Sequence, residues 1–136
     1  KLARTAQSLR RGLRAEVARA RGDFRSALAE IESFDFGTST RERNISHWGV
    51  RERFVRAELL LALHRDREAL AWYESFPAGY DTPYIAPAHY RLAQINDRLG
   101  DSERARFHRT RFVELWDGAD AHLQPRVDSA RAALVR

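Results

Sequence analysis

His89 and His108 are the residues of this chain best suited by type to do chemistry. An imidazole can serve as a general base or as a metal ligand near neutral pH. The two histidines fall on successive predicted helices, so they could approach each other across that helix pair. However, the five histidines lack metal-ligand spacing, and the sequence has no His-Glu-x-x-His, no cysteine pair and no phosphate-binding glycine loop. We therefore expect packed or surface histidines in a protein that is not an enzyme and needs no metal or cofactor.

A second group of reactive side chains is the set of arginines on the first predicted helix. Residues 1–21 hold seven Lys or Arg against one acidic residue, Glu16, whereas the remainder of the chain is close to neutral. Arginines on one face can contact the phosphates of a nucleic acid, and the candidates here are Arg4, Arg10, Arg11, Arg14 and Arg21. No aromatic residue lies between them for base stacking. We therefore expect a solvated face, or a junction with a preceding repeat, rather than a nucleic-acid site.

The composition limits the class of protein. A length of 136 residues allows one domain with a modest core. The absence of cysteine excludes disulfides, and no apolar run approaches the roughly 18 residues of a membrane span. No signal peptide is visible, so we expect a cytoplasmic protein without a membrane partner. The chain begins with lysine and lacks methionine, from which we expect it to be a fragment of a longer protein.

One helix-turn-helix pattern occurs three times and must position these side chains. Aligning three alanines places a phenylalanine seven residues after each one, on the same helical face. A residue suited to a left-handed turn stands five positions before each alanine, and an aspartate that could cap the second helix follows it. The alanines are Ala27, Ala69 and Ala105; the phenylalanines are Phe34, Phe76 and Phe112; the turn residues are Gly22, His64 and Gly100; the caps are Asp23, Asp66 and Asp101.

The pattern predicts an all-α fold in a single domain over residues 1–136. We expect hairpins at about 2–35, 46–76 and 87–116, with Pro87 in the first turn of its helix, and a capping helix at about 121–135. The first helix carries an apolar stripe that we expect to pack on the second helix, while the arginines face solvent. The stripe residues are Leu2, Leu9, Leu13, Val17 and Ala20.

These motifs resemble the tetratricopeptide repeat, whose second helix carries Ala-x3-aromatic and whose first carries Trp-x2-Leu-Gly. Ala27-x3-Ile31 and Ala69-x3-Tyr73 fit the second helix, and His89-x2-Leu92-Ala93 stands in place of the first-helix motif. Arg109 and Asn96 replace expected aromatics, and the alanine columns are 42 and 36 residues apart rather than the family's roughly 34. The closing run RFVELWDGADAHLQPRV is similar to the ends of repeat regions in large bacterial signalling proteins.

The resemblance implies an α-α solenoid of about three hairpins whose first helices line a concave groove. Carried over by column, the groove positions fall on Glu16, Arg19, Arg51, Phe54, Glu58, Tyr90, Arg91, Gln94, Asp97 and Arg98. The Lys and Asn pattern that grips a terminal carboxylate in some family members is missing. A mixed-charge groove with two aromatic residues suits an internal peptide segment or a partner helix better.

The function that the resemblance implies is a non-catalytic scaffold that binds a protein or peptide partner. A regulatory or ligand-sensing segment of a multidomain signalling protein is the second reading, and weak nucleic-acid binding through the first helix is the third. The sequence does not specify the partner or the oligomeric state.

Overall fold

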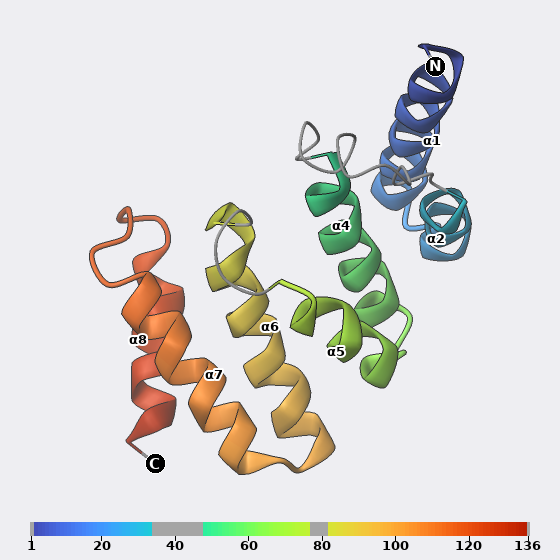
Figure 1. Cartoon of the computed structure of the whole chain (residues 1–136). Coiled ribbons are helices and arrows are strands. Elements are labelled where there is room, and N and C mark those ends of the chain that lie inside the picture. The colour runs from blue at the N-terminus through green and yellow to red at the C-terminus, as the bar shows by residue number, and fades with distance from the viewer. Residues whose placement is uncertain (1, 34–47, 77–81, 136) are drawn as a thin grey trace. The chain divides into compact units, whose positions relative to one another are not determined.

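The computed structural model describes residues 2–33, 48–76 and 82–135, and over these ranges the chain is all-helical (Figure 1). The predicted all-α class is confirmed for this part of the chain. The helices are α1 (Leu2–Ala20), α2 (Phe24–Glu32), α4 (Trp48–Ala62), α5 (Asp66–Glu74), α6 (Thr82–Leu99), α7 (Ser102–Leu115) and α8 (Gln124–Leu134). The chain forms two compact units, Lys1–Trp72 and Tyr73–Arg136. Among the described helices none has the length and apolar character to cross a bilayer.

Three turns between paired helices share one backbone geometry. Gly22, His64 and Gly100 adopt positive φ angles of 77°, 58° and 81°. In each turn the next residue donates its N–H to the carbonyl five residues earlier, over the same 2.9 Å from nitrogen to oxygen. A left-handed residue followed by this bond satisfies the last carbonyls of a helix. The predicted stops are therefore confirmed at all three positions, including His64, where a side chain is tolerated although glycine is favoured.

The helices that follow these turns begin in two different ways. Asp23 and Asp101 are N-caps, and their carboxylates accept the N–H of Ser26 and Arg104 at 3.1 and 3.0 Å. The prediction that Asp66 caps the middle pair is wrong, because Asp66 is already the first residue of α5. Arg65 takes the corresponding place and accepts the N–H of Ala69 through its carbonyl at 3.0 Å. The Arg65 side chain forms two bonds to Glu68, of 2.7 and 2.6 Å, which pull the pKa of Glu68 down and that of Arg65 up.

The repeated alanines are buried as predicted. Ala27, Ala69 and Ala105 are each 0% exposed. Phe76 and Phe112 are buried as well, and Phe34 lies outside the described residues. The burial of all three alanines confirms that the alanine column of the alignment faces the interior.

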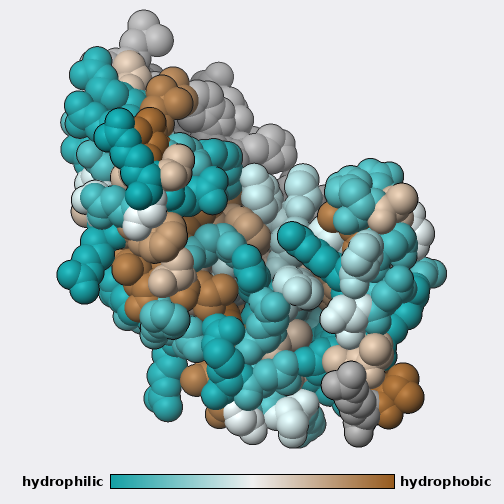
Figure 2. Space-filling model, turned by 180° about the vertical axis from the view of Figure 1, so that it is seen from behind, coloured by the Kyte–Doolittle hydropathy of each residue, from teal (hydrophilic) through white to brown (hydrophobic). Residues whose placement is uncertain are grey.

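The first helix presents the opposite face to that expected. Leu9, Leu13 and Val17 are 48%, 68% and 49% exposed, whereas Gly12 and Ala15 on the other side are buried. The predicted packing on α2 is therefore wrong for Leu9, Leu13 and Val17, and the side chain of Leu2 lies outside the described residues. Small residues of α1 face inward because α2 and α4 supply the bulky part of this core, including Leu28, Ile31, Leu59 and Leu60. Apolar patches lie among hydrophilic side chains on the surface of the part that carries α1 (Figure 2).

The core of the second unit is built around Phe112 of α7. Phe112 clusters with Ala86 of α6 and with Val127 and Ala130 of α8, and Tyr90, Val113 and Trp116 pack against this cluster. The rings of Tyr90 and Trp116 lie 5.0 and 5.1 Å from that of Phe112. The predicted final helix is thus present, with its buried stripe against α7.

Helix α6 starts earlier than predicted. It begins at Thr82, so Pro87 lies inside the helix rather than in its first turn. Pro83 is the proline that occupies the first turn, where the missing N–H would have had no helical partner.

Candidate functional site

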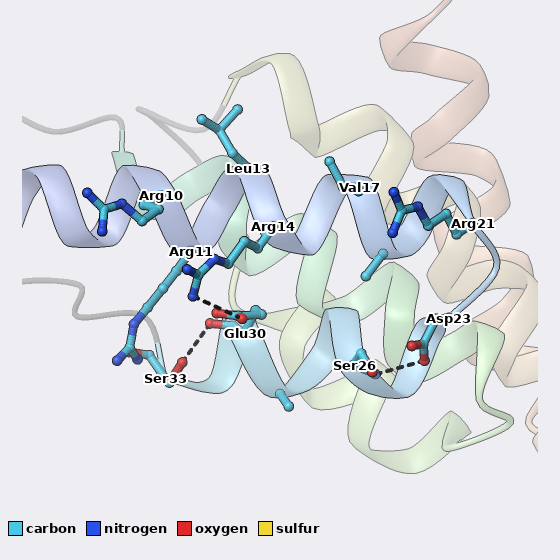
Figure 3. Close-up of a pocket in the computed structure, with 12 residues that line it drawn as sticks. Arg10, Arg11, Leu13, Arg14, Val17, Arg21, Asp23, Ser26, Glu30 and Ser33 are labelled. Atoms are coloured by element: carbon cyan, nitrogen blue, oxygen red, sulfur yellow. Dashed lines mark hydrogen bonds and ion pairs between the residues drawn. The ribbon is translucent and has the colours of Figure 1, made fainter.

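A shallow groove runs along α1 and α2 on the side away from α4 and α5 (Figure 3). It has a volume of about 880 Å³, and four arginines, two carboxylates and the apolar side chains of Leu13 and Val17 contribute to its lining. Leu13 and Val17 lie along one edge of α1, while Arg11 and Arg14 reach across towards α2. Sequence reasoning missed this groove because it assigned the apolar residues to the core. The small residues Gly12 and Ala15 on the opposite face were the available signal.

Two arginines of the predicted basic face are engaged within the first unit. Arg11 donates from Nη1 to the carbonyl of Ser33 at 2.5 Å, and Arg14 lies 3.8 Å from Glu30. The expectation that all of these arginines face solvent is therefore wrong for Arg11, which is half-buried. Arg10 and Arg21 are exposed, and the side chain of Arg4 lies outside what the structure describes. A nucleic-acid phosphate would have to compete with the contacts that Arg11 and Arg14 make to Ser33 and Glu30. These contacts weaken the hypothesis of nucleic-acid binding.

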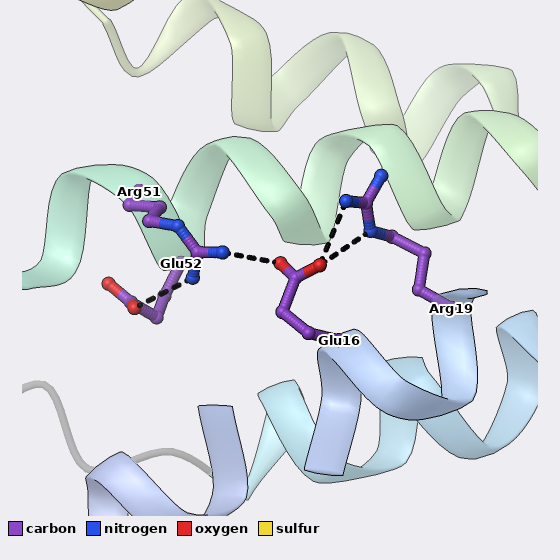
Figure 4. A network of polar contacts seen from close by, with 4 residues as sticks. All are labelled: Glu16, Arg19, Arg51 and Glu52. Carbon is purple, nitrogen blue, oxygen red and sulfur yellow. Dashed lines mark hydrogen bonds and ion pairs between the residues drawn. The ribbon is translucent and has the colours of Figure 1, made fainter. Parts of the chain in front are cut away.

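Three predicted groove residues meet at a shared carboxylate in the first unit (Figure 4). The Glu16 carboxylate of α1 accepts two hydrogen bonds from Arg19, at 3.0 and 2.8 Å, and one from Arg51 of α4, at 2.6 Å. This Glu16 cluster, consisting of Glu16, Arg19 and Arg51, joins the first helices of two successive pairs. Both arginine side chains remain about half exposed, at 49% and 50%. The cluster therefore links the pairs and still presents cations to solvent.

Glu52 extends the polar contacts beneath the Glu16 cluster. Its carboxylate lies 3.7 Å from Arg51, and its buried Oε2 atom has no hydrogen-bond partner among the residues that the structure describes. Burial raises the pKa of this carboxyl, although the Glu52 backbone N–H and Arg51 act in the opposite direction. The other two predicted groove residues of α4, Phe54 and Glu58, are half-buried.

The predicted groove residues of α6 have several different roles. Tyr90 is part of the second core, and the guanidinium carbons of Arg91 and Arg126 each lie 6.0 Å from its ring centre. Arg91 also donates to Gln94 at 3.1 Å. Asp97 forms an ion pair with Arg109 of α7, and Arg98 is exposed. Tyr90 is therefore as much a packing residue as a candidate contact, and the groove as a whole stays a prediction because its members divide between the two units.

His89 and His108 meet between α6 and α7, as their sequence positions allowed. Their Nδ1 atoms are 2.8 Å apart, so one ring donates to the other, and Phe107 packs edge-on against both. Burial lowers the pKa of His89, with a further contribution from Arg111. Burial, then the charge of His89 and of Arg104, lowers the pKa of His108 to about 4. Among the described residues, no group of three or more His, Cys, Asp or Glu side chains could hold a metal ion.

We predict that acid destabilises the second unit through this pair. A histidine with a depressed folded-state pKa stabilises the fold above its unfolded value near 6.5, and this contribution is lost as the pH falls towards 4. Half-exposed rings moderate the effect, so we expect a loss on the order of 1 kcal/mol between pH 7.5 and 5, measured by urea unfolding. His108→Gln should flatten this dependence, whereas His122→Gln, at an exposed histidine, should not. An unchanged slope in the His108 variant would contradict the assignment.

Comparison with known proteins leaves these features to be interpreted on their own. No protein-family model matches the chain, and neither a curated protein nor a solved structure matches it.

Proposed function

We propose that this chain is a non-catalytic protein-binding module of tetratricopeptide-like helix pairs. It binds a peptide segment or a partner helix along the first helices of successive pairs. The observation that carries this proposal is the turn geometry repeated at Gly22, His64 and Gly100, each followed five residues later by a fully buried alanine. In a helical solenoid, successive pairs present their first helices to a ligand, and α1 and α4 are two such helices of the first unit.

The Glu16 cluster supplies suitable chemistry on that row. A guanidinium group carries five N–H donors, more than Glu16 takes from either Arg19 or Arg51. The remaining donors can bind carboxylates or backbone carbonyls of an extended or helical segment. Such a partner would gain charge-assisted hydrogen bonds without first breaking the link between α1 and α4.

The test is a selection of binding peptides from a displayed library, using the intact chain as bait, followed by calorimetry with individual peptides. We expect Arg51→Ala to weaken binding about tenfold, because each guanidinium contributes charge-assisted bonds. Arg106→Ala removes an exposed arginine of α7 outside the predicted groove and should leave affinity unchanged. Failure to enrich any peptide would contradict the function. Peptides that bind the Arg51 variant as tightly as the original chain would contradict the groove.

A further inference from the structure

The exposed stripe of α1, formed by Leu9, Leu13 and Val17, is an unusual feature of the first unit. Successive members are four residues apart, so they follow one edge of the helix over about 12 Å, which is about two helical turns. Each is roughly half exposed or more. Single exposed apolar residues are ordinary, but a row of them beside a groove is typical of an interaction surface.

The surroundings of this stripe are positively charged. Arg10 and Arg14 lie on the same helix, Arg21 lies in the turn that follows it, and all three line the groove together with Leu13 and Val17. The carboxylates of α2 are partly occupied, since Asp23 caps its own helix and Glu30 lies near Arg14. The surface thus combines an apolar line with basic flanks.

We propose that the α1 and α2 groove docks an acidic amphipathic helix of a partner protein. Apolar residues spaced by three or four positions on that helix would cover Leu13 and Val17, and its Glu or Asp residues would meet the arginines. Charge complementarity selects this occupant over a basic helix, because the lining carries four arginines against two carboxylates. The bonds of Arg11 to the Ser33 carbonyl and of Arg14 to Glu30 leave this net positive charge in place. The site lies on the face of α1 and α2 away from α4, so it is distinct from the Glu16 cluster between α1 and α4.

This docking proposal rests on the proposed function only in the premise that the chain binds proteins. Different variants test the docking surface and the proposed function. The probe is a fluorescent peptide helix with leucines at positions i, i+4, i+7 and i+11 and glutamates beside them. Comparison peptides have either the same composition in scrambled order or lysine in place of glutamate. Anisotropy should show binding of the acidic helix alone, with affinity falling as salt rises.

Leu13→Asp is expected to weaken this binding at least about tenfold, since it places a charge in the apolar line and repels the glutamates. Leu13 is 68% exposed, so the fold should tolerate the change, and circular dichroism checks this. Leu115→Asp, at a leucine of α7 that is 42% exposed, is the control and should bind normally.

Several outcomes would overturn the proposal. These are no binding of the acidic helix, equal binding of the scrambled or lysine peptide, unchanged affinity in the Leu13 variant, or tighter binding of arbitrary duplex DNA. Sedimentation provides a further test, because a dimer of the original chain that Leu13→Asp dissociates would identify a second copy as the occupant. Loss of library peptides in the Arg51 variant, together with unchanged affinity of the acidic helix in the Leu13 variant, would leave the proposed function in place while excluding this second surface.

Discussion

Phe112→Ala should lower the free energy of unfolding of the second unit by about 3 to 5 kcal/mol, the largest effect expected of any single truncation here. Phe112 is 1% exposed and lies between the rings of Tyr90 and Trp116. Its removal deletes contacts to residues of α6 and α8 as well as to its own helix. Because α7 packs on both α6 and α8, the cavity should collapse only in part. Urea unfolding followed by circular dichroism measures the loss.

Phe107→Ala is the matched control on the same helix. Phe107 is 58% exposed, and its ring contacts are with His89 and His108. We expect a change below about 1 kcal/mol. Equal losses in the two variants would mean that Phe112 is not the centre of the second core, and the alignment that placed it with Phe76 would lose its physical basis.

The turns could be predicted from the sequence because their signals are local. A glycine at a left-handed position and an aspartate beyond it determine backbone geometry within a few residues. This reasoning succeeded even at His64, where only the alignment with Gly22 and Gly100 pointed to a positive φ. It failed at Asp66, because one extra residue shifted the aspartate into the helix and left Arg65 at the cap position.

The orientation of α1 could not be predicted in the same way. An apolar stripe indicates which face of a helix avoids water, but only the neighbouring helices decide whether that face is covered within the chain. Here α1 packs on α2, whose Leu28 and Ile31 are buried, and the α1 residue buried in this core is the small Ala15. The larger side chains of α1 are left exposed, and the groove that we propose as a docking surface results from this exclusion.

The sequence predicted which residues belong to the candidate site better than it predicted the contacts between them. The family columns brought Glu16, Arg19 and Arg51 into one list, and the structure joins them through one carboxylate. No sequence pattern indicated that Glu16 would be shared, because the pairing depends on how α1 and α4 approach. Tyr90 was also predicted to lie in the groove, but its ring packs on Phe112 in the second core. Its column therefore did not distinguish a binding residue from a packing residue.

Ala69→Leu should destabilise the first unit by about 1 to 3 kcal/mol through overpacking. Ala69 is 0% exposed, so a larger side chain has no room to move outward. Its N–H donates a hydrogen bond to the carbonyl of Arg65 in the turn, which holds the backbone in place. Leucine is nearly as good a helix former as alanine, so intrinsic propensity cannot account for a loss of this size. Thermal and urea unfolding measure the change.

The control for this substitution is two residues away on the same helix. Ala71 is exposed, and Ala71→Leu should alter stability by no more than about 0.5 kcal/mol. The same comparison can be repeated in α2, where Ala27 is fully buried and Ala29 is exposed. Agreement between the two helices would establish that the alanine column is a repeated packing position, as expected of stacked helix pairs. If Ala69→Leu and Ala71→Leu behave alike, the buried alanines are incidental, and the repeat assignment that supports the proposed function fails with them.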